Sequence, residues 1–111
     1  MKSARMESMV KGWFVGGFSP AALTTTACEV AVKTYRAGDN EGSHYHKEAI
    51  EVTVVLSGTV KMVGREWNSG DIVIVEPLEA TDFLAISDAI TVVVKVPGAL
   101  NDKYTLPPDA V

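Results

Sequence analysis

β-branched side chains constrain the fold of this chain more than any other feature of its sequence. Its 111 residues include 16 valines, five isoleucines and nine threonines, against only six leucines. A side chain that branches at Cβ loses rotamer freedom on a helix but packs well on a pleated sheet. We therefore expect an all-β protein, and the length allows one domain but not two.

Charge, hydropathy and cysteine content narrow the functional classes. The formal net charge is −4, from 14 acidic and 10 basic residues, and lacks the basic excess of a nucleic-acid-binding protein. Apolar runs extend over only a few residues, so we expect no membrane span. Cys28 is the only cysteine, which excludes an intramolecular disulfide and fits a reducing compartment. No signal peptide is visible, so we expect a cytoplasmic protein.

Turn-forming residues divide the chain into about eight to ten short strands. Residues 29–36 alternate between a face with Val30 and Val32 and a face with Ala31 and Lys33, as a strand does. The other principal strands expected are 43–46, 51–57, 59–63, 65–67, 72–75, 83–86 and 90–96, with a tight hairpin at Gly64.

The organisation has three parts: an N-terminal arm with a short edge strand (1–28), a strand-rich body (29–96) and a C-terminal tail (97–111). Within the arm, residues 12–18 are aromatic and glycine-rich and suit either the edge strand or an arm that lies across another surface. Ser19 and Pro20 suit the N-cap and first position of one helical turn. Pro107 and Pro108 exclude the end of the tail from a sheet interior.

Two predicted strands are apolar on both faces. Residues 72–75 (IVIV) and 92–94 (VVV) lack the polar alternation of a sheet with one wet face. Such strands are usually covered on both faces. A chain this small cannot cover both faces of each strand by itself, so we expect a homodimer that buries the outer face of one sheet.

The only two histidines, His44 and His46, are separated by Tyr45. Alternate side chains on a strand point to one face, so the two imidazoles project together. Residues 47–49 have low strand propensity, so the strand can end there. A new strand that begins at Glu51 can then direct this carboxylate toward the histidines. Two imidazoles and a carboxylate suit Fe(II), Mn(II) or Zn(II), with open positions for water or substrate. The alternative is an exposed histidine pair with no ligand role.

The surroundings of this pair have a regular spacing. Gly38, His44, His46, Glu51 and Gly58 form the pattern G-x5-H-x-H-x4-E-x6-G. This pattern resembles the first motif of the cupin family. The resemblance covers the strand-rich body and implies a jelly-roll barrel, or double-stranded β-helix, with the metal or substrate site inside it. The short interval before the next motif is typical of small, single-domain, RmlC-like cupins.

The family's second motif is only partly present. Gly70 opens it, and Pro77 follows one residue later than in the shortest form. Asp82 stands where the family has a histidine. The resemblance thus implies His44, His46 and Glu51 as metal ligands, with Asp82 as a fourth by position only. A second carboxylate would favour Mn(II), Fe(II) or Ni(II) over a zinc-only preference. An Asp82 that faces solvent is the alternative.

The sequence is compatible with three functions. A divalent ion held by these residues would serve a small-molecule enzyme, whether oxygenase, isomerase or lyase. The same pocket would serve a non-catalytic protein that binds a sugar or an organic acid. A metal-free isomerase or epimerase would use His44 or His46 as the general base. Each predicts a small polar metabolite as ligand, and the sequence selects none in particular.

Overall fold

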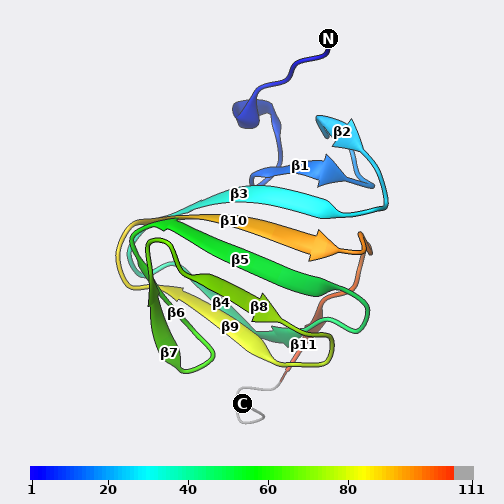
Figure 1. Cartoon of the computed structure of the whole chain (residues 1–111). Coiled ribbons are helices and arrows are strands. Elements are labelled where there is room, and N and C mark those ends of the chain that lie inside the picture. Colours follow the sequence, from blue (N-terminus) through cyan, green and yellow to red (C-terminus); the bar gives the residue numbers. More distant parts are fainter. Residues whose placement is uncertain (107–111) are drawn as a thin grey trace.

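The computed structural model describes residues 1–106 (Figure 1). Within this range the chain forms two β-sheets, with one 3-10 turn at Met6–Ser8, so the predicted all-β class is confirmed. In the same range no helix has the length and apolar character that crossing a membrane requires. The prediction for Pro107 and Pro108 lies outside the described residues.

The larger sheet contains, within residues 1–106, six strands in the order β2-β1-β3-β10-β5-β8. Their bounds are Leu23–Thr24 (β2), Trp13–Gly16 (β1), Glu29–Tyr35 (β3), Ala89–Val96 (β10), Ile50–Ser57 (β5) and Ile72–Val75 (β8). β1 and β2 are parallel, and the other neighbouring pairs are antiparallel. The valine-rich segments of the sequence thus lie side by side in the middle of this sheet.

The smaller sheet contains, in the described part of the chain, five strands in the order β11-β4-β9-β6-β7. Their bounds are Tyr104–Thr105 (β11), Asn40–Tyr45 (β4), Thr81–Ala85 (β9), Thr59–Met62 (β6) and Arg65–Asn68 (β7). Val63 and Gly64 join β6 to β7 with positive φ angles of 53° and 76°, as a two-residue hairpin turn requires. The predicted hairpin is therefore confirmed.

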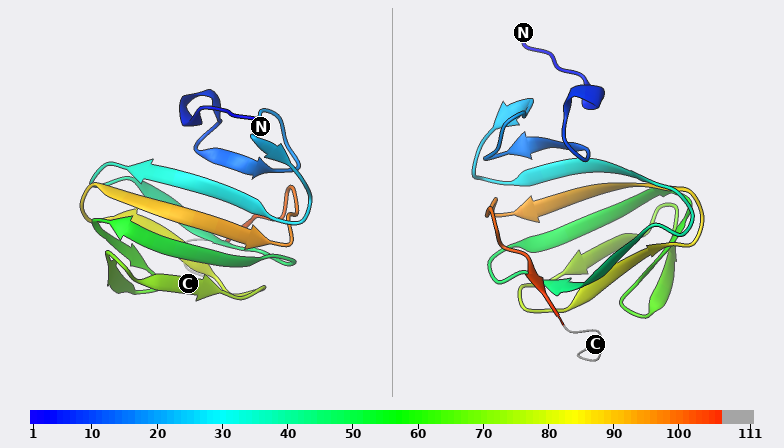
Figure 2. Two further views of the ribbon diagram at one scale, coloured as in Figure 1. Left: turned by 45° about the horizontal axis from the view of Figure 1, so that its top comes forward. Right: turned by 180° about the vertical axis from the view of Figure 1, so that it is seen from behind.

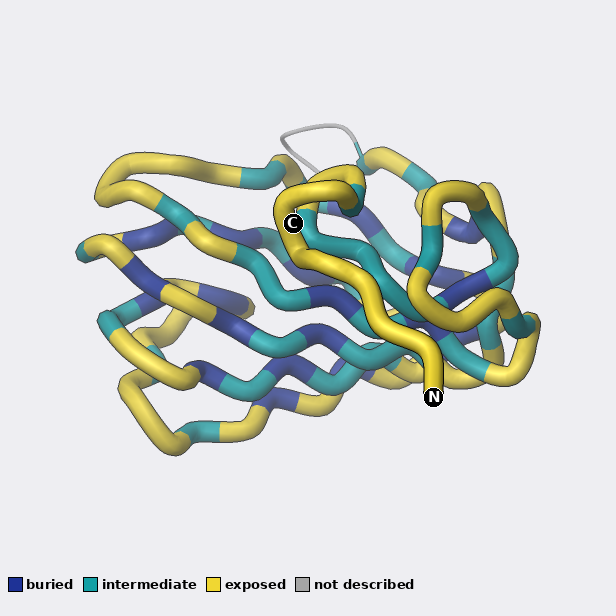
Figure 3. The backbone as a smooth tube through the Cα atoms, turned by 90° about the horizontal axis from the view of Figure 1, so that it is seen from above, coloured by how far each residue is buried: buried dark blue, intermediate teal, exposed yellow. Residues whose placement is uncertain are grey.

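The two sheets pack face to face and enclose the core between them (Figure 2). Burial alternates along the central strands, so one face of each strand points inward (Figure 3). The apolar core consists of Val55, Val60, Met62, Val73, Val75, Phe83, Ala85 and Ala89, with Tyr35 and Trp67 packed against it. Both sheets contribute to this cluster, which joins them into one barrel.

Four neighbouring strands of the larger sheet also present apolar side chains away from the barrel. Their register forms two rows across β3, β10, β5 and β8, which we call the outer face. The rows are Val32, Val92, Val54 and Ile72, followed by Val30, Val94, Val52 and Ile74. The valine face of β3 therefore points outward, and its Ala31 and Lys33 face points inward.

The arm and the tail differ in part from the sequence expectation. The helical turn predicted at Ser19 and Pro20 is wrong, because the chain bends there and enters β2 beside β1. Ala22 donates its N–H to the Phe14 carbonyl, 2.8 Å away, and this pairing satisfies backbone groups that a single helical turn would leave free. The tail contributes β11, an edge strand that pairs with β4.

Candidate metal site

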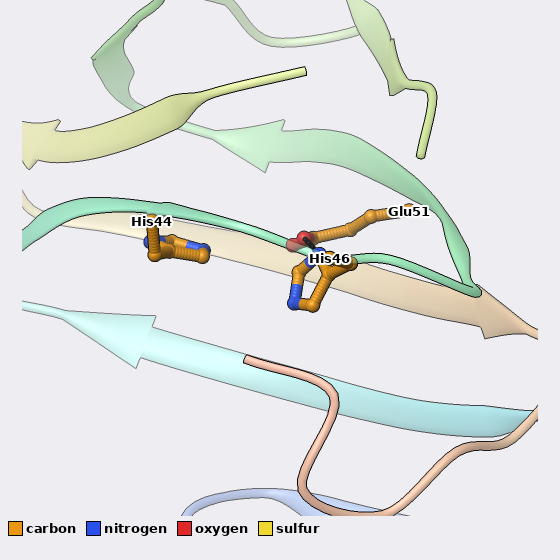
Figure 4. A group of neighbouring side chains, drawn as sticks. All are labelled: His44, His46 and Glu51. Carbon is orange, nitrogen blue, oxygen red and sulfur yellow. Dashed lines mark ion pairs between the residues drawn. The ribbon is translucent and has the colours of Figure 1, made fainter. Parts of the chain in front are cut away.

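His44, His46 and Glu51 lie together inside the barrel (Figure 4). His44 belongs to β4, His46 follows its last residue, and Glu51 is the second residue of β5. Each offers one possible ligand atom, and these atoms all lie within 4.8 Å of one another. The predicted chain break at residues 47–49 is confirmed, and it brings the carboxylate to the side of the two imidazoles.

The turn between His46 and Glu51 is held from the far end of the chain. Asp102 accepts hydrogen bonds from the backbone N–H groups of Lys47, Glu48 and Ala49, at 2.9, 3.0 and 3.0 Å. Burial alone would raise the pKa of the Asp102 carboxyl, but these three donors together hold it below its usual value. Sequence analysis missed this residue, because no local pattern links it to a turn more than 50 positions away.

One hydrogen bond sets the tautomer of His44. Its Nδ1 lies 2.9 Å from the carbonyl oxygen of Gly42. A carbonyl can only accept, so Nδ1 carries the proton in this contact and the lone pair remains on Nε2. Metal-binding histidines are commonly oriented by such a bond from the other ring nitrogen. His44 is therefore poised to ligate through Nε2.

His46 and Glu51 face each other in a buried environment. The His46 Nδ1 and Glu51 Oε2 atoms are 3.4 Å apart. Burial, with Lys95 and His44 nearby, lowers the pKa of His46 to about 4, so the ring is neutral at pH 7. Burial also raises the pKa of Glu51. The contact is therefore not an ion pair at neutral pH, and the carboxylate has no cation from this histidine.

The donor atoms fit a cation. Among the described residues, His46 Nε2 and Glu51 Oε2 are buried without a hydrogen-bond partner. Unpaired buried polar atoms are costly, and a divalent ion would satisfy both of them. Two neutral imidazoles and one carboxylate are also a common ligand set for transition metals. The group meets the chemical requirements of such a site.

A pocket of about 240 Å³ opens beside this group. His44, Glu51 and Thr81 contribute to its wall. Four lysines line it as well: Lys11, Lys33, Lys95 and Lys103. The sequence analysis did not single out these lysines, although the alternation it noted in residues 29–36 placed Lys33 on the face that turns out to be inside.

Comparison with known proteins identifies the architecture. No family model matches the sequence, and no curated protein matches it significantly. Among solved structures, a conserved double-stranded β-helix protein from Klebsiella pneumoniae matches with a TM-score of 0.67 and 24% identity, over 76% of this chain and 73% of that one. An RmlC-like cupin from Desulfovibrio desulfuricans matches at 0.62 and 21%, over 68% and 76%. This chain has the cupin fold.

An enzyme shares this cupin fold. The DMSP lyase DddQ from Ruegeria pomeroyi matches with a TM-score of 0.68 and 18% identity, over 89% of this chain and 52% of that one. At such identities the likeness concerns architecture, and the predicted jelly-roll barrel is confirmed. The site residues have to be judged from their own geometry.

The structure does not bring Asp82 into the histidine group. Asp82 lines the pocket, but its Oδ1 accepts a hydrogen bond from the Val63 N–H at 3.0 Å. The buried positions of β9 are Thr81, Phe83 and Ala85, so Asp82 falls on the other face of this strand. A shift of one residue along a strand exchanges its two faces.

Thr81, the residue before Asp82, is the one whose side chain faces inward. It is buried and stands opposite His44 in the pairing of β4 with β9. The second cupin motif has the approximate spacing G-x5-P-x-G-x2-H. Its histidine position falls on Thr81 when it is counted from Gly70, and on Asp82 when it is counted from the displaced Pro77. The count from the glycine was the signal that could have found it.

Proposed function

We propose that this protein binds a divalent transition metal through His44, His46 and Glu51 and thereby holds a small polar metabolite in its barrel. The observation that carries the proposal is the convergence of three buried donor groups within 4.8 Å. Two of their atoms lack any other partner in the described residues, which is the condition that a bound ion would relieve.

Each residue of the group would have a separate role in binding the metal. His44, oriented by Gly42, and His46, placed by the turn that Asp102 holds, would supply nitrogen ligands. Glu51 would supply an oxygen and offset part of the ion's charge. When bound, the ion would act as a Lewis acid on an oxygen of the ligand. Thr81 and Thr91 would present small polar side chains to the pocket.

With three protein ligands, the site suits Mn(II), Fe(II), Ni(II) or Zn(II). The argument for a harder metal depended on Asp82 as a second carboxylate, and Asp82 lies outside the group. The open positions would remain for water or for the metabolite. A lyase with the same fold supports an enzymatic use of such a pocket, and turnover of a bound compound separates an enzyme from a sensor.

Metal analysis of protein purified without chelator tests this proposal. We expect a transition metal at up to one equivalent in the wild type, and background content in the folded His44→Ala/His46→Ala double variant. Asp82→Ala should retain the metal, as should Glu48→Gln, which removes an exposed carboxylate near the site. Metal content that is equal in the wild type and in the double variant would contradict the assignment. It would leave the histidines free for the general-base alternative.

We also propose that a second copy of the chain covers the outer face in a homodimer. Its eight valines and isoleucines form an uncharged surface, and Ile72 and Ile74 are 58% and 59% exposed. Apolar patches of this kind mark interaction sites. A twofold axis brings a surface against itself, and a face without charges can be stacked on its copy without burying an unpaired ion.

Light scattering tests the homodimer. Ile72→Lys together with Ile74→Lys should convert the protein to a monomer at micromolar concentration, because the change places charges at the interface. Leu78→Lys is the matched control, since Leu78 is 69% exposed and lies outside the sheet. A wild-type monomer, or a dimer that the double variant preserves, would contradict this interface.

A further inference from the structure

The pocket gathers lysines in a protein that is acidic as a whole. The chain has 10 basic residues and a net charge of −4, yet four of its lysines line this one pocket. Lys33 and Lys95 come from β3 and β10, Lys11 precedes β1, and Lys103 precedes β11. Segments from both ends of the chain and from its middle thus bring ammonium groups to the same place.

Two of these ammonium groups lie within cation–π distance of the same aromatic ring. Lys33 Nζ and Lys95 Nζ lie 5.0 and 4.9 Å from the centre of the Trp13 ring. The ring offers both cations a weakly attractive face. Burial, followed by the charges of Lys95, Lys11 and Lys103, lowers the pKa of Lys33, while Glu41 acts in the opposite direction. The cluster is therefore partly desolvated and mutually repulsive.

The carboxylates near the lysines form no ion pair with them. In the described part of the chain, no carboxylate lies within 4.0 Å of any of the four ammonium groups. Glu29 and Glu51 flank Lys95 in the sheet register, but Glu29 accepts a hydrogen bond from the Ala99 N–H and Glu51 faces His46. Glu41 also lines the pocket, where it accepts a hydrogen bond from the Tyr35 hydroxyl.

The size of the pocket limits what can enter. Its volume of about 240 Å³ equals that of roughly eight water molecules in the liquid. A ligand held wholly within this space is a small molecule. A ligand that spans from the histidine group to the lysines is therefore a compact molecule with polar groups at both ends.

We propose that the pocket is selective for a small organic anion, with its negative group among Lys33, Lys95 and Lys103 and another oxygen directed to the His44–His46–Glu51 group. This inference deepens the proposed function, because it names the chemical class of the metabolite. Charge-assisted hydrogen bonds from the lysines would hold a carboxylate or a phosphate. Neutral sugars would lose these contacts and leave the ammonium groups unpaired.

Calorimetric titration with malonate and with its neutral analogue malonamide tests the proposal. We expect malonate to bind and malonamide to bind at least roughly tenfold more weakly, as the loss of charge-assisted contacts requires. Lys33→Met and Lys95→Met should each weaken malonate binding by roughly tenfold. Lys61→Met is the matched control, because Lys61 is exposed on β6 and does not line the pocket. Inorganic phosphate as a third probe distinguishes the two kinds of anion.

Metal content measured on the same samples separates this inference from the proposed function. Malonate binding that needs Lys33 and Lys95 supports the anion site whether or not metal is found. Equal affinity for malonate and malonamide would overturn it, even in a protein that carries its metal. Equal malonate affinity in Lys33→Met, Lys95→Met and Lys61→Met would also overturn it.

Discussion

The two ends of the barrel interior are built from different chemistry on the same strands. The inward-facing side chains of β10 run from Ala89 to Lys95, and those of β5 run from Glu51 to Val55. Because the two strands are antiparallel, Lys95 lies beside Glu51 at one end. At the opposite end the inward side chains form the apolar core, whose Phe83 also reaches the pocket wall. At the Lys95 end they are histidines, threonines, lysines and carboxylates around the pocket.

This difference separates stability from function along each strand. The apolar end excludes water and contributes the hydrophobic free energy of folding. The polar end keeps buried groups unpaired, including atoms of His46 and Glu51, which costs stability in the absence of a ligand. Substitutions at the first end should therefore affect unfolding, and those at the second should mainly affect binding.

The largest effect is expected at the apolar end. Phe83 is buried and stacks on Tyr35, with ring centres 4.3 Å apart. Phe83→Ala should lower the free energy of unfolding by about 3–5 kcal/mol, because it leaves a cavity. Urea denaturation measures this loss. A loss below about 1 kcal/mol would mean that the two ends do not differ as described.

Metal removal should affect only the polar end. Chelation should lower the melting temperature of the wild type, since an ion at a concentration 100 times its Kd stabilises the fold by about 2.7 kcal/mol. The His44→Ala/His46→Ala variant should show no change with chelator. Thermal denaturation with and without chelator measures both. An equal shift in the two proteins would place the ion elsewhere.

The hydrogen bonds that Asp102 accepts should make the free energy of unfolding depend on pH. Asp102→Asn should lower the free energy of unfolding at pH 7 by about 1–3 kcal/mol, because it removes part of the acceptor set of three backbone N–H groups, of which that of Ala49 is buried. The pKa of Asp102 is lowered from 3.8 in the folded state. Its contribution is therefore complete above pH 4 and is lost as the pH falls through the folded-state value.

Urea denaturation between pH 7 and pH 2 measures this pH dependence. The difference between wild type and Asp102→Asn should shrink at the acid end of the range. A constant difference over that range would contradict the assigned role of the carboxylate.

The smallest effect is expected at Thr91. Its Oγ1 is buried and has no hydrogen-bond partner among residues 1–106. Thr91→Val should change the free energy of unfolding by less than about 1 kcal/mol, or raise it, because an unpaired hydroxyl is replaced by a methyl group. Val93→Thr on the same strand face is the control and should cost about 1–3 kcal/mol. A large loss in Thr91→Val would show that this hydroxyl has a partner.

Local sequence patterns anticipated much of the fold and the three residues that gather in the candidate metal site. The period of two along a strand placed His44 and His46 on one face, and the weak strand residues at 47–49 allowed Glu51 to return toward them. β9 shows the limit of this reasoning. The second motif points to Thr81 or to Asp82, depending on the residue from which it is counted, and only the packing of the strand shows that Thr81 faces inward.

The sequence by itself determined which residues form strands and which side chains share a face, because both depend on neighbours along the chain. Tertiary structure decided which face is inside. In β3 the valines point outward and Lys33 points into the pocket, since the interior of a sheet is defined by the sheet packed against it. The same holds for Asp102 and Lys103, which reach the site only because the tail pairs with β4.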